Sequence, residues 1–524
     1  MRNGRKYGYR LAVFAALLAF FLIAGRNGPV LFDDSGSYMQ VHRHEGVMPV
    51  YPIFILTNQL IFGEAVYLWA VIMEQAVLAA FSVFLLEETI RKRFGLRPLE
   101  SVLICMLALY PYTIEMPAAV MTQAILTEGV AYSLFYIFLG IILRAVWEKS
   151  YAWLGGAAGM ALFLSALRSQ LQILFGVCGI IFLYVICMRG KGRGKKALRF
   201  AAGMAGAAAL SLAGIALVSM IAGSYQTAMQ SNHPFYLFRL RVQQPEDYQR
   251  VLEKKEQKEA AKRTDSGEKA AMTEAEEKKK LVNKAFSNSQ YVTLIFSRGI
   301  YEGDYEDAEL FSDPVLRGLY LVLYEAADAE EQRYAYAEKG LWMWKDIVDG
   351  VGRVGITCMR EPSKYYVKYA PEIIRADDFS EVRAGHLRTI GLTLIRAHFG
   401  RFLYHTLLLL PQAFISTVFF QYAPLYLLCH LITAFLYLTA AALMIWGYRE
   451  ERIKNDSAEM MALVLGTNFV MVLVISLIFY GQQRYLVYAF GPFYMAYYLL
   501  LRQLWRVRLR DLWKKRRLPR KRGV

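Results

Sequence analysis

The chain has 524 residues, of which 56% are apolar, and its formal net charge is +17. The apolar residues gather in blocks of about 20, the length that a helix needs to cross a bilayer, so an ordinary soluble protein is excluded. The charge does not indicate a nucleic-acid partner, because the basic residues cluster beside the ends of apolar blocks, as in the positive-inside pattern. These clusters lie within residues 2–10, 91–97, 189–199, 449–454 and 502–522.

The pattern predicts an all-α polytopic membrane protein with about ten spans, and leaves eleven or twelve open. An N-terminal membrane module covers residues 1–222, and its outer loop lies at 32–64. Counting from a basic, cytoplasmic start places this loop outside. The seven helices expected in the module are 9–31, 65–87, 99–113, 127–146, 152–167, 170–188 and 199–222.

Residues 223–390 are polar and are expected to form a small, mainly helical extracytoplasmic domain. Within it, 253–284 is rich in Lys, Glu and Ala, which favours an exposed helix or a flexible charged insertion. Residues 311–350 alternate apolar and charged side chains at helical spacing. Specificity is expected to reside in this domain.

A C-terminal membrane module is predicted at 391–503, with helices at 424–447, 458–480 and 485–503. Residues 399–420 are interpreted as an interfacial or re-entrant helix, because a full span there would place the basic tail outside. The tail, 504–524, is expected to lie against anionic lipid at the cytoplasmic surface. The protein is therefore expected in the plasma membrane, with both termini cytoplasmic.

Asp33 and Asp34 follow the first predicted helix directly. A carboxylate held at the rim of a helix bundle can take a proton from a hydroxyl group, or can help to hold a divalent cation such as Mg²⁺ or Mn²⁺. The alternative is a polar loop in which Ser35 begins a turn. The expected chemistry needs no other cofactor.

The string Asp34-Ser35-x-Ser37-Tyr38, followed by Tyr51-Pro52, resembles the first-loop motif of GT-C glycosyltransferases. These are polytopic enzymes that use polyprenyl-phosphate sugars, and the likeness is to bacterial mannosyl- and arabinosyl-transferases. Four further elements resemble the same family in both membrane modules, but none lies in 223–390. They are Leu126-Thr127-Glu128 at a helix start, Arg168 after a helix rich in small residues, the stretch Ile395–Leu403, which resembles an amphipathic helix that re-enters the membrane in bacterial members, and Gln482-Gln483-Arg484-Tyr485-Leu486 before the last helix.

The resemblance implies transfer of a sugar from a polyprenyl-phosphate donor to a glycan, lipid or protein acceptor, with inversion. It implies that Asp34 is the base and that Arg484, beside Tyr485, contacts the donor phosphate. Further residues of the substrate site would be Arg168, Glu128, Tyr38 and Tyr51. Many members carry Asp-Glu where this chain has Asp34-Ser35, so a two-carboxylate metal site would need Asp33 as its second ligand.

Other interpretations stay open. Arg484 could be an arginine that extends to the membrane interface, and Glu128 could favour a helix N-terminus through the dipole. A transporter or flippase for a lipid-linked saccharide is one alternative function, and it would show repeated halves with broken helices near the midplane. A polysaccharide polymerase or ligase is another, for which an outer loop rich in Arg and His is expected.

Overall fold

The computed structural model describes residues 2–41, 47–114, 119–189, 196–230, 233–253, 282, 291–328, 343–375, 379–419, 425–449, 455–480 and 486–517. Within these residues every regular element is a helix, and the β-type pairing is a single bridge between Val30 and Ala124. The all-α prediction is therefore confirmed for the described part of the chain.

Seven helices of the described chain are long and apolar enough to cross a membrane, as a multi-pass membrane protein requires. They lie in both predicted modules. Their helical conformation keeps the backbone hydrogen bonds internal, as a segment in lipid requires, and their apolar side chains suit a hydrocarbon environment. They are α1 (Arg2–Ala24), α4 (Tyr67–Phe94), α6 (Thr127–Glu148), α8 (Ile173–Arg189) together with the 3-10 turn η4 (Ser169–Gln172) that leads into it, α9 (Lys196–Ala228), α19 (Tyr426–Arg449) and α20 (Asn455–Ile478).

Three more predicted spans are helices, but each lacks a full apolar span. Two of them, α5 (Pro98–Ile114) and α7 (Tyr151–Leu167), have 17 residues. The third, α22 (Phe490–Arg517), becomes basic from Arg502 onward. All ten predicted helices thus exist, while ten crossings stay a prediction.

The stretch 32–64 contains two helices that the sequence analysis did not foresee. They are α2 (Ser35–Met39) and α3 (Val50–Phe62). With 13 residues, α3 is apolar but too short to span a bilayer, and therefore the search for long apolar blocks overlooked it. It packs against α4.

A second hydrophobic core lies in the later part of the chain. The described residues of 311–350 include the helical stretches 314–328 and 343–350, in keeping with the helical spacing of that segment. Since α17 continues past residue 390 and packs in this core through Leu394, the predicted boundary at 390 falls inside a helix. The charged stretch 253–284 lies outside the described residues, apart from residues 253 and 282. The elements here are α10 (Pro234–Gln243), α13 (Tyr291–Glu302), η6 (Tyr305–Leu310), α14 (Pro314–Asp328), α15 (Met343–Tyr369), α16 (Pro371–Arg375), α17 (Phe379–Ala397) and α18 (Phe399–Ile415).

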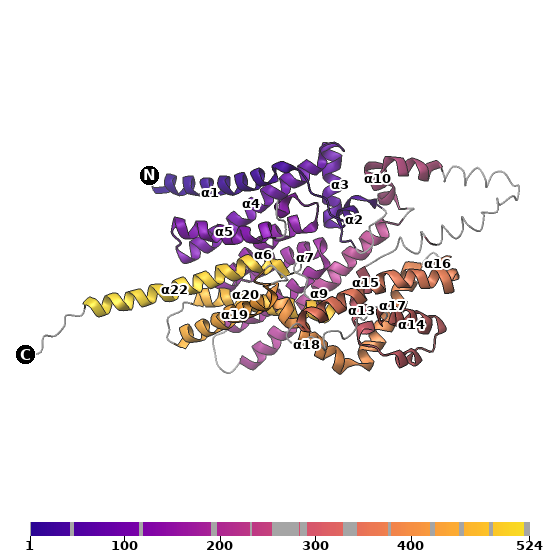
Figure 1. Ribbon diagram of the computed structural model, residues 1–524. Helices are drawn as coiled ribbons and strands as arrows, with labels where there is room; N and C mark the ends of the chain where they lie inside the picture. Colours follow the sequence, from indigo (N-terminus) through magenta and orange to yellow (C-terminus); the bar gives the residue numbers. More distant parts are fainter. Residues whose placement is uncertain are drawn as a thin grey trace, which may run out of the picture.

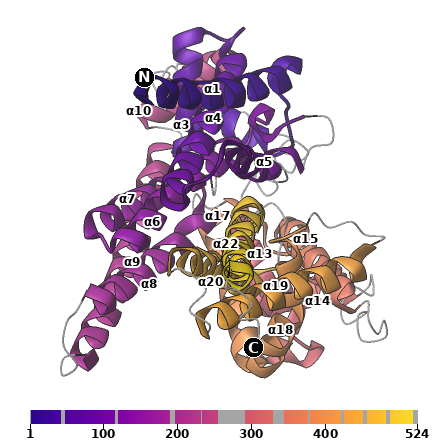
Figure 2. The ribbon, with the colours of Figure 1, turned by 90° about the vertical axis from the view of Figure 1, so that its left-hand side faces the viewer.

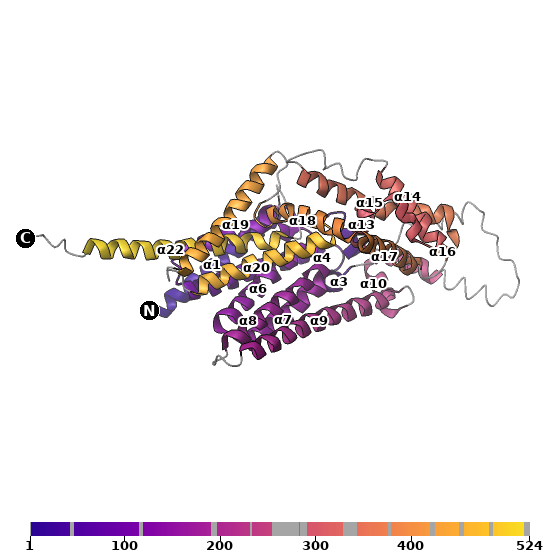
Figure 3. The same cartoon turned by 90° about the horizontal axis from the view of Figure 1, so that it is seen from below.

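The bundle is elongated, and both chain ends lie at the same end of it, which we call the terminal end (Figure 1). At the opposite end lie α2, α3, α10 and the helices from α13 to α17 (Figure 1). Seen along its length, the bundle has α8 and α9 projecting from one side (Figure 2). Helices α7, α8 and α9 run side by side (Figure 3). Since α9 has 33 residues, it is about 50 Å long and exceeds the hydrocarbon thickness.

Ion pairs join the two membrane modules at the terminal end. Arg93 Nη2 lies 2.5 Å from Asp456 Oδ1, and Lys149 Nζ lies 2.6 Å from Glu459 Oε1. Arg502, on α22, places Nε 2.6 Å from Oε1 of Glu100 on α5. Each pair has one partner in each module, so the contacts hold α20 and α22 against the N-terminal helices.

Helices α13 and α17 cross at two glycines, where backbone meets backbone. A Cβ atom on Gly299 would lie 2.2 Å from the carbonyl oxygen of Gly391, far inside van der Waals contact. A Cβ on Gly391 would likewise meet Phe296 at 2.6 Å. Close packing of α13 against α17 therefore requires glycine at both positions.

Gly299→Ala is expected to destabilise this core by about 1–3 kcal/mol, because neither backbone can yield without separating the helices. The matched control is Gly385→Ala on α17, where no atom lies within 4 Å of the added Cβ. The control should be neutral, or stabilising by up to about 1 kcal/mol, since Ala favours the helix. Thermal unfolding in detergent measures both, and equal midpoints for the two variants would contradict the tight crossing.

Candidate functional site

The segment that leads into α2 is hydrogen-bonded to the segment that leads into α6. Val30 N donates to the carbonyl oxygen of Gln123 at 2.9 Å, and Ile125 N donates to the carbonyl oxygen of Val30 at 3.0 Å. The Gln123 side chain adds a third bond, from Nε2 to the carbonyl oxygen of Gly28 at 3.0 Å. The residues that follow, Asp34 on one side and Glu128 on the other, are thereby held in one neighbourhood.

Gln75, a fully buried side chain of the apolar helix α4, makes hydrogen bonds to this junction. Its Nε2 donates to the carbonyl oxygens of Thr122 (3.0 Å) and Ala124 (3.2 Å). Its Oε1 accepts a hydrogen bond from the Tyr51 hydroxyl at 3.2 Å. The sequence analysis missed Gln75, although an uncharged polar side chain within an apolar span was a usable signal.

Glu128, at the start of α6, forms an ion pair with Arg168, which follows the last residue of α7. Their side chains are only 3% and 9% exposed. Thr127 Oγ1 donates to Glu128 Oε2 at 3.0 Å. Burial by itself would lower the pKa of Arg168, but Glu128, followed by Tyr488 and Tyr38, raises it well above its usual value. The guanidinium therefore stays charged and neutralises Glu128.

Tyr38, on α2, interacts electrostatically with both members of this ion pair and with Asp34. Its ring packs edge to face against Tyr51, with centroids 5.1 Å apart. Burial raises the pKa of Tyr38, Glu128 and Asp34 raise it further, and Arg168 opposes them. The phenol therefore stays neutral and keeps a proton to donate.

The three predicted carboxylates of this region differ in environment. Asp33 is exposed, Asp34 is partly exposed and Glu128 is buried with Arg168. Asp34 is thus a partly exposed carboxylate that also interacts with the partly buried Tyr38. Five of the eight residues predicted for the site, Asp34, Tyr38, Tyr51, Glu128 and Arg168, come together.

Arg484 and Tyr485, predicted to contact the donor phosphate, lie outside the described residues. The C-terminal module nevertheless reaches the cluster through Tyr488, which is 1% exposed and influences the pKa of Arg168. The Tyr488 ring packs against Tyr132 with centroids 4.9 Å apart. Tyr488 therefore joins the C-terminal module to α6 by packing.

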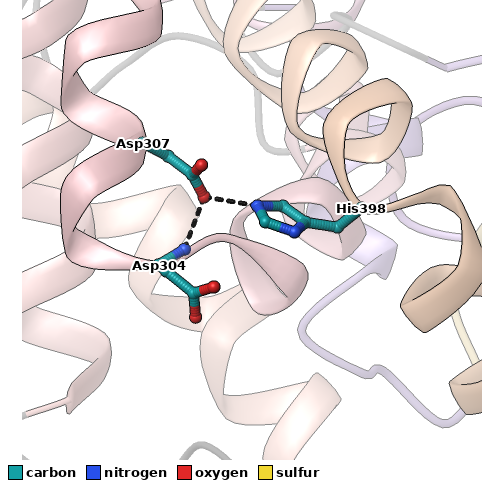
Figure 4. A group of neighbouring side chains, drawn as sticks. All are labelled: Asp304, Asp307 and His398. Carbon is teal, nitrogen blue, oxygen red and sulfur yellow. Dashed lines mark hydrogen bonds and ion pairs between the residues drawn. The ribbon is translucent and has the colours of Figure 1, made fainter.

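Among the described residues, one group of three possible metal ligands lies away from Asp33 and Asp34 in the chain. It consists of Asp304, Asp307 and His398, whose ligand atoms lie within 4.8 Å of one another (Figure 4). His398 Nε2 lies 2.6 Å from Asp307 Oδ2. Arg401 donates to both carboxylate oxygens of Asp304 at 3.0 Å. Protein groups therefore already engage both carboxylates.

A further pair of a basic and an acidic side chain lies one turn along α18 from Arg401, in the protein interior. His405 Nδ1 lies 2.6 Å from Oε2 of the fully buried Glu302. Arg298, also fully buried, approaches the other oxygen of Glu302 at 3.5 Å. His398, Arg401 and His405 thus face acidic groups of α13 and η6, and this arrangement joins α18 to the second core.

Breaking the Glu128–Arg168 pair on one side should be costly. Glu128→Gln is expected to destabilise the protein by about 3 kcal/mol, because it leaves Arg168 buried without a counter-charge. Glu128→Gln combined with Arg168→Gln should cost clearly less than the sum of the two single changes. A double-mutant cycle of unfolding free energies in detergent measures this coupling, and additive losses would contradict a strong buried pair.

The chain was also compared with known proteins. No protein-family model, no curated protein and no solved structure matches it.

Proposed function

We propose that the protein is a membrane glycosyltransferase that moves a sugar from a polyprenyl-phosphate donor to an acceptor at the outer face of the plasma membrane. The fold proposed with it is a GT-C-like bundle of about ten spans, with residues 223–390 outside. The observation that carries the proposal is the position of Asp34. It is a partly exposed carboxylate directly before α2, and it interacts electrostatically with Tyr38, which also interacts with the buried Glu128–Arg168 pair. Helix α2 lies at the end of the bundle opposite the termini (Figure 1).

In the proposed reaction, Asp34 takes the proton of an acceptor hydroxyl while that oxygen attacks the anomeric carbon of the donor sugar. The bond from the anomeric carbon to the phosphate oxygen breaks, and the electron pair leaves with the polyprenyl phosphate. Attack opposite the leaving group inverts the anomeric centre. The acceptor is a glycan, lipid or protein hydroxyl.

The other residues have supporting roles in this proposal. Arg484 stabilises the leaving phosphate, since a guanidinium stays charged and matches phosphate oxygens in a fork geometry. Tyr38 is a neutral hydrogen-bond donor for the sugar, in keeping with its raised pKa. Arg168 and Glu128 were predicted to contact substrate, but their mutual ion pair favours a supporting role behind Tyr38.

Asp34→Asn should lower kcat by about 10²–10⁴-fold, the range expected for loss of a general base. The matched control is Glu64→Gln, an exposed carboxylate in the same stretch 32–64 that has no role in the proposed reaction and should retain activity within about twofold. The assay follows transfer from radiolabelled polyprenyl-phosphate pentoses and hexoses in proteoliposomes. Turnover retained by Asp34→Asn would remove Asp34 as the base, and chelation followed by added Mg²⁺ or Mn²⁺ would reveal a metal requirement.

The proposed orientation is tested by cysteine labelling in a Cys187→Ser background, since the other four cysteines are buried. Asp33→Cys should react with a membrane-impermeant maleimide in intact cells. Lys92→Cys, at an exposed position of the terminal end, should react only after permeabilisation. The reverse pattern would place the candidate site in the cytoplasm.

A further inference from the structure

Arg239, on α10, is 1% exposed and lies directly behind the loop that carries Asp34. Its Nη2 donates to the backbone carbonyl oxygen of Tyr38 at 2.9 Å. Its Nη1 donates to the Tyr225 hydroxyl, and its Nε to Gln243 Oε1, both at 2.6 Å. One side chain thus joins α2, the end of α9 and α10.

The bonding partners of Arg239 in the described part of the chain are all neutral groups. Burying a guanidinium costs several kcal/mol unless its donors are satisfied, and here a carbonyl, a hydroxyl and an amide satisfy them. Burial lowers the pKa of Arg239, and Tyr225 partly opposes this. If the Tyr38 carbonyl moved away, Nη2 of the buried guanidinium would lose this acceptor. The cost of that loss holds the backbone of α2 in place.

Three further hydrogen bonds tie the same loop to the α9–α10 segment. Val41 N donates to Gln244 Oε1 at 3.0 Å, on the C-terminal side of α2. Gln226 Nε2 donates to the Val47 carbonyl oxygen at 3.3 Å, and Gln59 Nε2 donates to the Val242 carbonyl oxygen at 3.2 Å. A small core beneath them contains Val41, Tyr225, Met229, Tyr236 and Leu240.

We propose that Arg239 is a positioning residue for the transferase reaction, which clamps α2 through the Tyr38 carbonyl and so holds Asp34 and Tyr38 in register with the Glu128–Arg168 pair. This inference rests on the proposed function and goes beyond it, because it assigns to residues 225–244 the task of holding the reactive loop. A displacement of about 1 Å at a reacting group can cost about 10²-fold in rate, so the clamp has a large effect without touching substrate.

The test uses Arg239→Met in the full-length protein, with Arg241→Met as its matched control. Arg241 lies on the same helix but is exposed. Amide hydrogen exchange in peptides covering 33–41 should become at least tenfold faster in Arg239→Met and stay unchanged in Arg241→Met, while peptides from α6 exchange as in the wild type. Tyr225→Phe serves as a second test if Arg239→Met fails to fold. It keeps the ring in the core and removes one hydrogen bond of Arg239, so amide exchange in 33–41 should increase, but by less than tenfold.

The catalytic arm compares turnover of the same variants. Arg239→Met should lower kcat by about 10–100-fold with the KM for the donor within about twofold, and Arg239→Lys should recover part of the loss. In the Asp34→Asn background, Arg239→Met should cause no further loss, because no base remains to be positioned. A purely structural effect would instead add to that of Asp34→Asn, and additivity would overturn the proposal.

Unchanged exchange in 33–41 for Arg239→Met would also overturn it. Wild-type protein without turnover on any labelled donor would contradict the proposed transferase, and with it the catalytic part of this inference. The exchange measurement would still decide in that case whether Arg239 orders the loop, so the two failures are distinguishable.

Discussion

The two hydrogen bonds at Val30 are the contact on which the candidate site depends. They join Val30, after α1, to the short 3-10 helix η3 (Met121–Gln123) and the residues that follow it before α6. Buried backbone groups outside helices need partners, and here each segment supplies the partners of the other. Without this junction nothing would relate the direction of α2 to that of α6. Asp34, Tyr38 and Glu128 would then be three unrelated polar residues.

Much of the helical architecture could be predicted because a bilayer imposes a length and a composition on each span. A helix of the described chain covers each of the ten predicted segments, and the two termini lie at one end of the bundle. The prediction was wrong where length carried no signal. Helix α3 is apolar but short, and α17 runs through residue 390, where a change in composition had indicated a boundary.

The candidate site was predictable in its membership but not in its contacts. Motif order brought Asp34, Glu128 and Arg168 to one region, yet the ion pair between the last two depends on how α6 packs against α7. Gln75 gave a weak signal as a polar residue in an apolar span. Arg239 gave no signal in the sequence. Its role depends on the contact of α10 with α2, and no local pattern in residues 234–243 predicts that contact.

The buried Glu128–Arg168 pair has a consequence for how the chain is assembled in the membrane. Glu128 begins α6 and Arg168 directly follows α7, so the two charges lie at the open end of one helical hairpin. A lone carboxylate or guanidinium is costly in lipid, but both charges enter together and can compensate each other before any later helix is synthesised. The Glu128–Arg168 pair therefore needs no counter-charge from outside the hairpin. The C-terminal module, which is synthesised last and contributes Tyr488, then packs against a pair of opposite charges that already compensate each other.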